Sequence, residues 1–113
     1  MNYSGLELSS LSWLMPELQA ALDQVRLLAL ESQEKRAPAL LKKAAKHVHE
    51  TVGAFQILDA QGLIQFVESI ETALTQLASR HEVSAHDYAT IDEACAGLLN
   101  YLQEVQQIGR AHV

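Results

Sequence analysis

The sequence predicts an all-α protein folded as an antiparallel four-helix bundle, and three observations lead to this fold class. Aromatic residues make up only 5% of the 113 residues, and the chain has only five glycines and two prolines, so good helix formers dominate. Apolar residues recur at intervals of three and four in four separate segments. Short polar breaks join these segments, so neighbouring helices must run antiparallel, in an up-down-up-down order.

The first helix is expected over residues 12–31, after a short N-terminal lead-in at residues 1–11. Ser12 is a suitable N-cap, and Pro16 then falls in the first turn, where a missing N–H costs nothing. Trp13 is expected to pack over one end of the bundle. The apolar stripe of this helix consists of Leu14, Leu18, Ala21 or Leu22, Val25 and Leu28.

The second helix is expected over residues 38–58, with Pro38 as its first residue. Its buried stripe is Leu41, Ala44, Ala45, Val48, Val52, Phe55 and Leu58. A turn at residues 59–62 leads into the third helix, expected over residues 62–80. The stripe of that helix is Leu63, Phe66, Val67, Ile70, Leu74 and Leu77.

The fourth helix is expected over residues 85–108. Ser84 and Asp87 have the spacing of a capping box, with Asp in place of the usual Glu. Gly109 is placed to stop the helix, which leaves residues 110–113 as a tail. The core stripe is Tyr88, Ile91, Cys95, Leu98, Leu102, Val105 and Ile108.

Composition narrows the classes of function. A net charge of −6 argues against nucleic acid or an anionic membrane as the main partner. The single cysteine, Cys95, cannot form an internal disulfide, and no apolar run approaches the length of a membrane span, so a cytoplasmic protein without membrane insertion is expected. The length fits a single domain, residues 1–113, and the polar outer helix faces favour a monomer.

One polar stripe of the second helix carries the candidate site. Lys42, Lys46, His49, Gly53 and Gln56 are separated by four, three, four and three residues, so they share a solvent-facing side of the helix. Glycine inside a helix costs about 0.8–1 kcal/mol relative to alanine. Gly53 lies one turn beyond His49, and its missing side chain leaves open surface where a partner can approach the imidazole. The stripe therefore predicts a docking surface around an exposed histidine.

The third helix is expected to supply a carboxylate to this histidine. In a hairpin whose turn centres near residue 60, Glu71 lies level with His49. A carboxylate that accepts a hydrogen bond from one imidazole N–H fixes the tautomer and leaves the other nitrogen free as a nucleophile. Lys42, Lys43 and Lys46 place positive charge in the preceding turns, where it can attract an acidic partner or steady a phosphoryl group.

Other chemistries have less support in the sequence. His47 and His49 are two residues apart and point to different sides of the helix, so they cannot chelate a metal as an i, i+4 pair would, and no metal or cofactor is expected. Cys95 falls on a core position and is read as an inert buried thiol. A small enzyme would need converging polar groups beyond His49 and Glu71, and the chain has no Gly-rich phosphate loop.

With these residues in place, the chain resembles the histidine-phosphotransfer (Hpt) domains. The segment His49-Glu-Thr-Val52-Gly53-Ala-Phe55-Gln-Ile-Leu58 is similar to their motif His-x-x-Lys-Gly-x-x followed by an apolar turn. The opening Leu-Ser-Ser-Leu-Ser-Trp13 and the phrase Val52-Gly-Ala-Phe-Gln56 resemble the N-terminal Hpt-like domain of CheA-like hybrid histidine kinases of type IV pilus chemosensory systems. The resemblance extends loosely over residues 12–108. It implies that the chain can be the front part of a longer histidine kinase.

The resemblance implies a role for each matching residue. His49 would accept a phosphoryl group from a kinase catalytic domain and pass it to an aspartate of a receiver (response regulator) domain in a chemotaxis-type two-component system controlling twitching motility. Glu71 would orient the imidazole, and Lys46 would assist the phosphate. The domain itself would be a phosphocarrier and not an enzyme. Val52 replaces the motif lysine and Glu68 replaces a second histidine of CheA-type domains, so a docking module that carries no phosphate remains the alternative.

Overall fold

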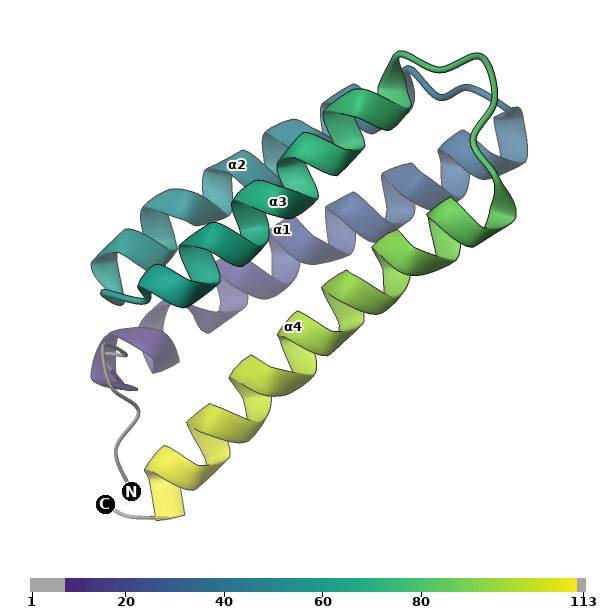
Figure 1. Cartoon of the computed structure of the whole chain (residues 1–113). Coiled ribbons are helices and arrows are strands. Elements are labelled where there is room, and N and C mark those ends of the chain that lie inside the picture. Colours follow the sequence, from purple (N-terminus) through teal and green to yellow (C-terminus); the bar gives the residue numbers. More distant parts are fainter. Residues whose placement is uncertain (1–7, 112–113) are drawn as a thin grey trace.

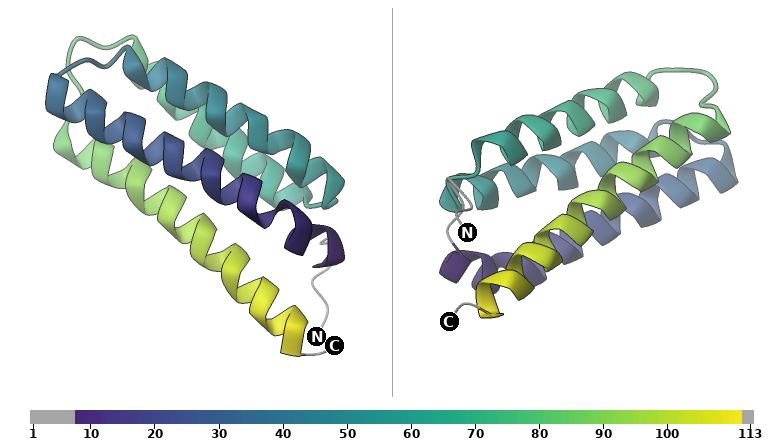
Figure 2. Two further views of the ribbon diagram at one scale, coloured as in Figure 1. Left: turned by 180° about the vertical axis from the view of Figure 1, so that it is seen from behind. Right: turned by 60° about the horizontal axis from the view of Figure 1, so that its bottom comes forward.

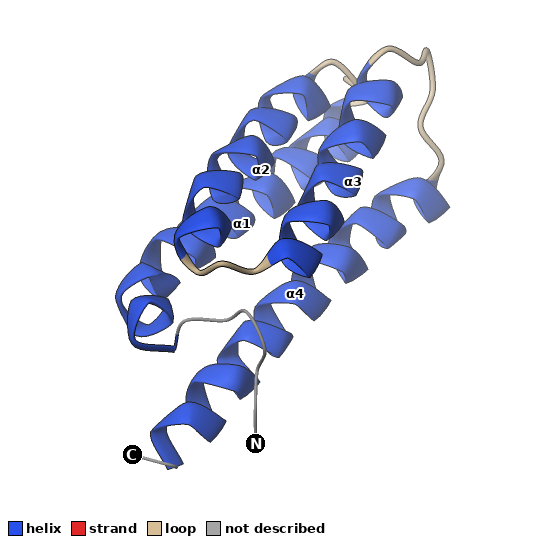
Figure 3. Ribbon diagram, turned by 60° about the vertical axis from the view of Figure 1, so that its left-hand side comes forward, coloured by secondary structure: helices blue, strands red, loops and turns tan. Residues whose placement is uncertain are grey.

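The computed structural model describes residues 8–111, which form four helices and no strand (Figure 1). Helix α1 spans Leu8–Lys35, α2 spans Leu40–Ile57, α3 spans Gln61–Ala78 and α4 spans Ala85–Ala111. Consecutive helices run antiparallel, and short loops join them (Figure 3). The predicted all-α, antiparallel four-helix bundle is confirmed.

The helices pack around α1 and α2. Helix α1 packs on both α2 and α4, and α2 packs on α3, whereas α3 and α4 have few contacts with each other. The views in Figure 2 show α4 lying along α1 and diverging from α2 and α3 toward the end of the bundle where α1 begins and α4 ends. The bundle is therefore closed on three sides and looser on the fourth.

The core is built from the predicted apolar stripes. Leu22, Val48, Leu74 and Leu102 are fully buried, one from each helix, and Phe55 is the largest fully buried side chain. Burying each such side chain contributes about 1.5–3 kcal/mol to folding. The core assignment is wrong for the third helix at one point: Ile64 is buried, and Phe66 remains 41% exposed.

The boundaries of α1 differ from those expected. The helix begins at Leu8 and not at residue 12, so Ser12 is an exposed residue inside the helix and not its N-cap. Pro16 lies in the third turn of α1 and not in the first, at a cost to the helical hydrogen bonding. Trp13 is 78% exposed and does not cover the end of the bundle. Residues 8–11 of the expected lead-in are helical, and residues 1–7 lie outside the described part.

Helix α1 also ends later than expected, at Lys35. The polar segment after residue 31 loses the apolar period, but it completes the last turn because Ser32 is buried in the bundle. Arg36 then adopts a left-handed conformation with φ of 51°, and the Ala37 N–H donates to the carbonyl of Ser32 at 2.9 Å. This is the hydrogen bond that closes a Schellman-type helix end, formed here without the usual glycine.

The other helices also differ from expectation at their ends. Helix α2 begins at Leu40, so Pro38 lies before it and is not its first residue. Helix α2 ends at Ile57, and Asp59, with φ of 54°, takes the left-handed position of a second Schellman-type end, in which the Ala60 N–H donates to the Phe55 carbonyl at 3.0 Å. Helix α3 spans 61–78 and not 62–80. Helix α4 continues through Gly109 to Ala111, so glycine does not stop it.

Side-chain hydrogen bonds hold the end of the bundle where the α1–α2 and α3–α4 loops lie. The Asp87 N–H donates to Ser84 Oγ at 3.1 Å and the Ser84 N–H donates to Asp87 Oδ2 at 3.3 Å, which confirms the capping box at the start of α4. Ser32 Oγ donates to the Ala37 carbonyl at 2.9 Å and lies 2.7 Å from the Tyr88 hydroxyl. Tyr88 therefore ties α4 to the junction of α1 and α2.

No helix in residues 8–111 combines the length and apolar character needed to cross a membrane.

Candidate functional site

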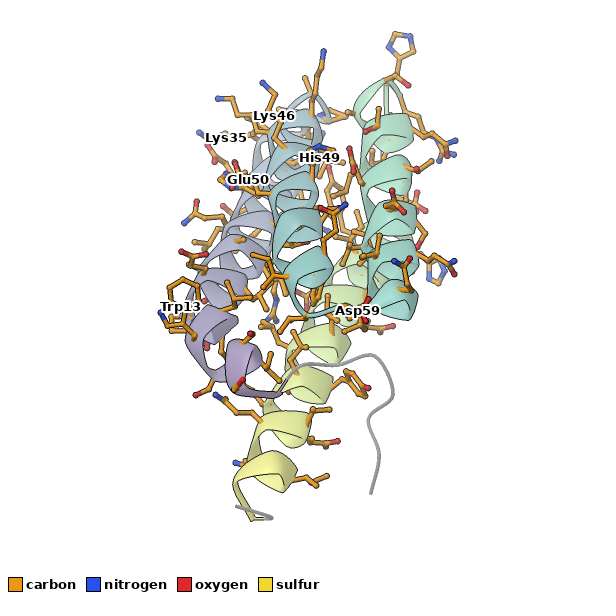
Figure 4. The ribbon with its side chains drawn as sticks, turned by 90° about the vertical axis from the view of Figure 1, so that its left-hand side faces the viewer. Trp13, Lys35, Lys46, His49, Glu50 and Asp59 are labelled. Carbon is orange, nitrogen blue, oxygen red and sulfur yellow. The ribbon has the colours of Figure 1, made fainter. Side chains whose placement is uncertain are left out.

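The candidate site lies on the outer side of α2, near the middle of the bundle. Lys42, Lys46, His49, Gly53 and Gln56 are all exposed, as the spacing predicts, because the opposite side of the helix is buried against α1 and α3. Figure 4 shows His49 on the side of α2 that faces α3, with Lys46 toward the start of the same helix.

The side chain of His49 contacts the neighbouring helix α3. Its Nδ1 lies 3.1 Å from Glu71 Oε1, across the seam between α2 and α3. An ionised carboxylate can only accept a hydrogen bond, so in a neutral imidazole this contact places the proton on Nδ1 and leaves the lone pair on Nε2. The His49 side chain is 70% exposed while that of Glu71 is 31% exposed, so the carboxylate holds an imidazole that extends into solvent. The hairpin symmetry correctly placed Glu71 level with His49.

Gly53 leaves the surface open one turn beyond the histidine. A Cβ built at this position would meet no atom within 4 Å, so packing does not require glycine here. The helical backbone does not require it either, since Gly53 lies inside regular α2 and does not have a positive φ. Nothing in the fold of the chain itself therefore explains why residue 53 is a glycine.

A shallow groove of about 400 Å³ runs beside the imidazole along α3. Its walls include Glu68 and Glu71 together with residues that the sequence analysis did not single out, Thr72, Thr75 and Gln76. Their spacing from Glu68, at four, seven and eight residues, is the signal that places them on one helix face. The Thr72 and Thr75 hydroxyls donate to the backbone carbonyls of Glu68 and Glu71, at 3.0 and 2.9 Å, so these hydroxyl protons are already used.

Charge is distributed unevenly around His49. Lys42, Lys43 and Lys46 are exposed on the N-terminal side of the histidine, and none of them forms an ion pair within the described part of the chain. Glu68 and Glu71 lie on the α3 side. The imidazole thus stands between a basic surface on α2 and an acidic one on α3.

Val52 stands where the resemblance to Hpt domains predicts a lysine. It is partly buried and packs against the core. Val52 lies at the edge of the buried face of α2 and brings no charge to the imidazole. The exposed Lys46, one turn before His49, is the nearer source of positive charge along the helix.

His47 is separated from His49 by the helix itself. It is half-buried against α1, where it lines a groove with Glu17 and Gln24, and its Nδ1 lies 3.7 Å from Glu50 Oε2. The two histidines therefore face different helices. No cluster of three or more His, Cys, Asp or Glu side chains suited to a metal ion occurs in residues 8–111.

Cys95 is fully buried in α4, and burial raises the pKa of its thiol to about 11. A thiol with this pKa is almost wholly protonated near neutral pH, which makes it a poor nucleophile.

Comparison with known proteins adds no relative: no protein-family model, no curated protein and no solved structure matches the chain.

Proposed function

We propose that this chain is a histidine phosphocarrier module of a two-component, chemotaxis-type signalling system. The observation that carries the proposal is the contact between His49 Nδ1 and Glu71 Oε1, with the other ring nitrogen on an open surface. This arrangement prepares one nitrogen for attack and leaves space for a partner to reach it. The resemblance to Hpt domains of type IV pilus systems names the pathway, and a cytoplasmic setting follows from it.

The reaction needs a phosphodonor domain and a phosphoacceptor domain as partners, and it needs no substrate pocket in this chain. In the first step, the Nε2 lone pair attacks the γ-phosphorus of ATP held by a kinase catalytic domain, an N–P bond forms, and the bond to ADP breaks. The ring then carries positive charge, which the Glu71 carboxylate stabilises through Nδ1–H. In the second step, an aspartate of a receiver domain attacks the same phosphorus, and the N–P bond breaks to restore neutral His49.

The residues around His49 would serve partner binding. Gly53 lets a partner surface approach the imidazole closely, and Lys42 and Gln56 extend the contact along α2. Lys46 would place positive charge beside the transferred phosphoryl group. The basic surface also suits a receiver domain, whose phosphoacceptor pocket is acidic.

Two phosphodonors test the proposal. The first is labelled ATP with the kinase core of the chain's own system, and the second is phosphoramidate, a small donor that needs no docking. We expect acid-labile, alkali-stable label on the wild type and on His47→Gln, which is the matched control two residues away, and none on His49→Gln. Phosphorus NMR should place the phosphoryl group on Nε2. Absence of label, under conditions in which an established Hpt domain is labelled, would refute the proposal.

The alternative is an interaction module in which the same surface docks a partner and no phosphate moves. Val52 favours it, since the motif lysine is replaced by a side chain that packs against the core. The experiment above separates the two functions. A partner that binds wild type and His49→Gln equally, with no label from either donor, would establish the docking module.

A further inference from the structure

The surface between α3 and α4 is unlike the rest of the bundle. Helices α3 and α4 have few contacts, and the seam between them contains a groove of about 240 Å³. Its lining is almost entirely apolar and consists of Leu63, Phe66, Gly97, Leu98 and Tyr101. Phe66 and Tyr101 are 41% and 44% exposed, so two large rings stand at the groove without being covered.

Gly97 gives this groove its depth on the α4 side. It is exposed within regular α4, and a Cβ built there would meet nothing within 4 Å. Glycine at such a position costs about 0.8–1 kcal/mol relative to alanine. The bare backbone lines the groove together with Phe66 and Tyr101 and allows another chain to approach closely.

The charges beside the groove have one sign. Helix α3 contains Glu68 and Glu71 but no lysine or arginine, and α4 contains no lysine or arginine from residue 85 to residue 109. Glu93 and Glu104 lie four residues before and seven residues after Gly97, on the same face of α4. The α4 border of the groove is therefore acidic. Around Phe66 the α3 border is uncharged, with Gly62, Ser69 and Ala73 on that face.

We propose that this groove binds an amphipathic helix of a partner protein, with apolar side chains one turn apart in the groove and lysine or arginine along the edge that faces α4. A groove between two helices suits the apolar stripe of a third helix. Glu93 and Glu104 select the basic edge and its orientation. The surface is separate from His49, which lies on the seam between α2 and α3, and it does not depend on phosphotransfer.

Other occupants fit less well. A second copy of this chain carries its lysine cluster on α2, at Lys42, Lys43 and Lys46, but the apolar stripe of α2 is already buried between α1 and α3. A second copy would have to unfold to present the apolar and basic faces of α2 together. An anionic membrane would be repelled by the acidic residues of α4.

Two model peptides test the proposal with the whole chain. Both are amphipathic helices with leucine at i, i+3, i+4 and i+7, one with lysine and the other with glutamate at the polar positions. Calorimetry should show that the leucine–lysine peptide binds and that the leucine–glutamate peptide binds at least about tenfold more weakly. Backbone amide signals of Phe66, Gly97 and Tyr101 should shift with the first peptide, and those of α1 should not.

Variants locate the binding site independently of the peptide charge. Gly97→Phe places a large ring in the groove from an exposed position where a Cβ meets no atom within 4 Å, so binding of the leucine–lysine peptide should fall at least about tenfold. Trp13→Ala, which removes an exposed aromatic side chain outside the groove, is the matched control and should bind as the wild type does. Binding that survives Gly97→Phe, or equal binding of both peptides, would overturn the proposal. A wild-type dimer in sedimentation that Gly97→Phe dissociates would show that the occupant is a second copy.

Discussion

Replacing Gly53 with alanine should stabilise the protein, because nothing in the folded structure requires glycine at this position. The residue lies inside α2, and a Cβ would meet no atom within 4 Å. The gain is then the difference in helix propensity, about 0.8–1 kcal/mol. For a chain near 100 residues, each kcal/mol corresponds to a rise in Tm of about 4–8 °C, so Gly53→Ala should melt a few degrees above wild type.

Thermal unfolding followed by circular dichroism measures this gain. Gly97→Ala is the parallel case in α4, because it is equally open and equally interior, and it should gain a similar amount. Gly62→Ala serves as the control: Gly62 is the second residue of α3, where helix propensity counts for less, so its gain should be smaller. If Gly53→Ala melted at or below the wild-type temperature, the reasoning that the glycine is unneeded for folding would be wrong.

The remaining predictions concern the polar contacts and the thiol. Ser84→Ala removes the N-cap of α4 and should cost about 0.5–2 kcal/mol in urea unfolding. The hydrogen bond with Ser84 lowers the pKa of the Asp87 carboxyl in the folded state. The stability that this hydrogen bond contributes is therefore present above the usual carboxyl pKa and is lost as the pH falls through the lower pKa of the folded state. Asp87→Asn should abolish that part of the acid dependence of stability. Ser32→Ala leaves the buried Tyr88 hydroxyl without its partner and should cost about 1–3 kcal/mol. Because the pKa of Cys95 is raised to about 11, stability should fall as pH rises above the unfolded thiol value toward 11, and Ellman's reagent should react at pH 8 only as fast as the chain unfolds.

The central part of the fold follows from the order of apolar and polar residues alone. The spacing of apolar residues at intervals of three and four positions fixes which face of each helix is buried, because burial of apolar surface dominates the folding free energy. Hairpin symmetry places Glu71 beside His49, since two helices joined by a short turn have a determined register. The capping box at Ser84 and Asp87 is also local, and the structure has it as predicted.

Helix ends were decided by tertiary contacts. The segment after residue 31 lacks an apolar period, yet α1 continues to Lys35 because Ser32 is buried and bonded to Tyr88, 56 residues away in the sequence. We expected Pro38 to be the first residue of the second helix and Gly109 to follow the last residue of the fourth, because proline and glycine are most frequent at those positions. The structure places both elsewhere, because such preferences amount to about 1 kcal/mol and packing of a whole helix outweighs them.

The open seam between α3 and α4 is also a property of the assembled bundle. Phe66 belongs to the apolar period of α3, so the sequence by itself predicts that it is buried. It is exposed because α4 packs along α1 and leaves few contacts with α3. The sequence by itself thus determined the four helices, their buried faces and the pairing of His49 with Glu71. Only the tertiary structure decided where α1 ends and which apolar side chains remain uncovered, because both depend on contacts between residues far apart in the chain.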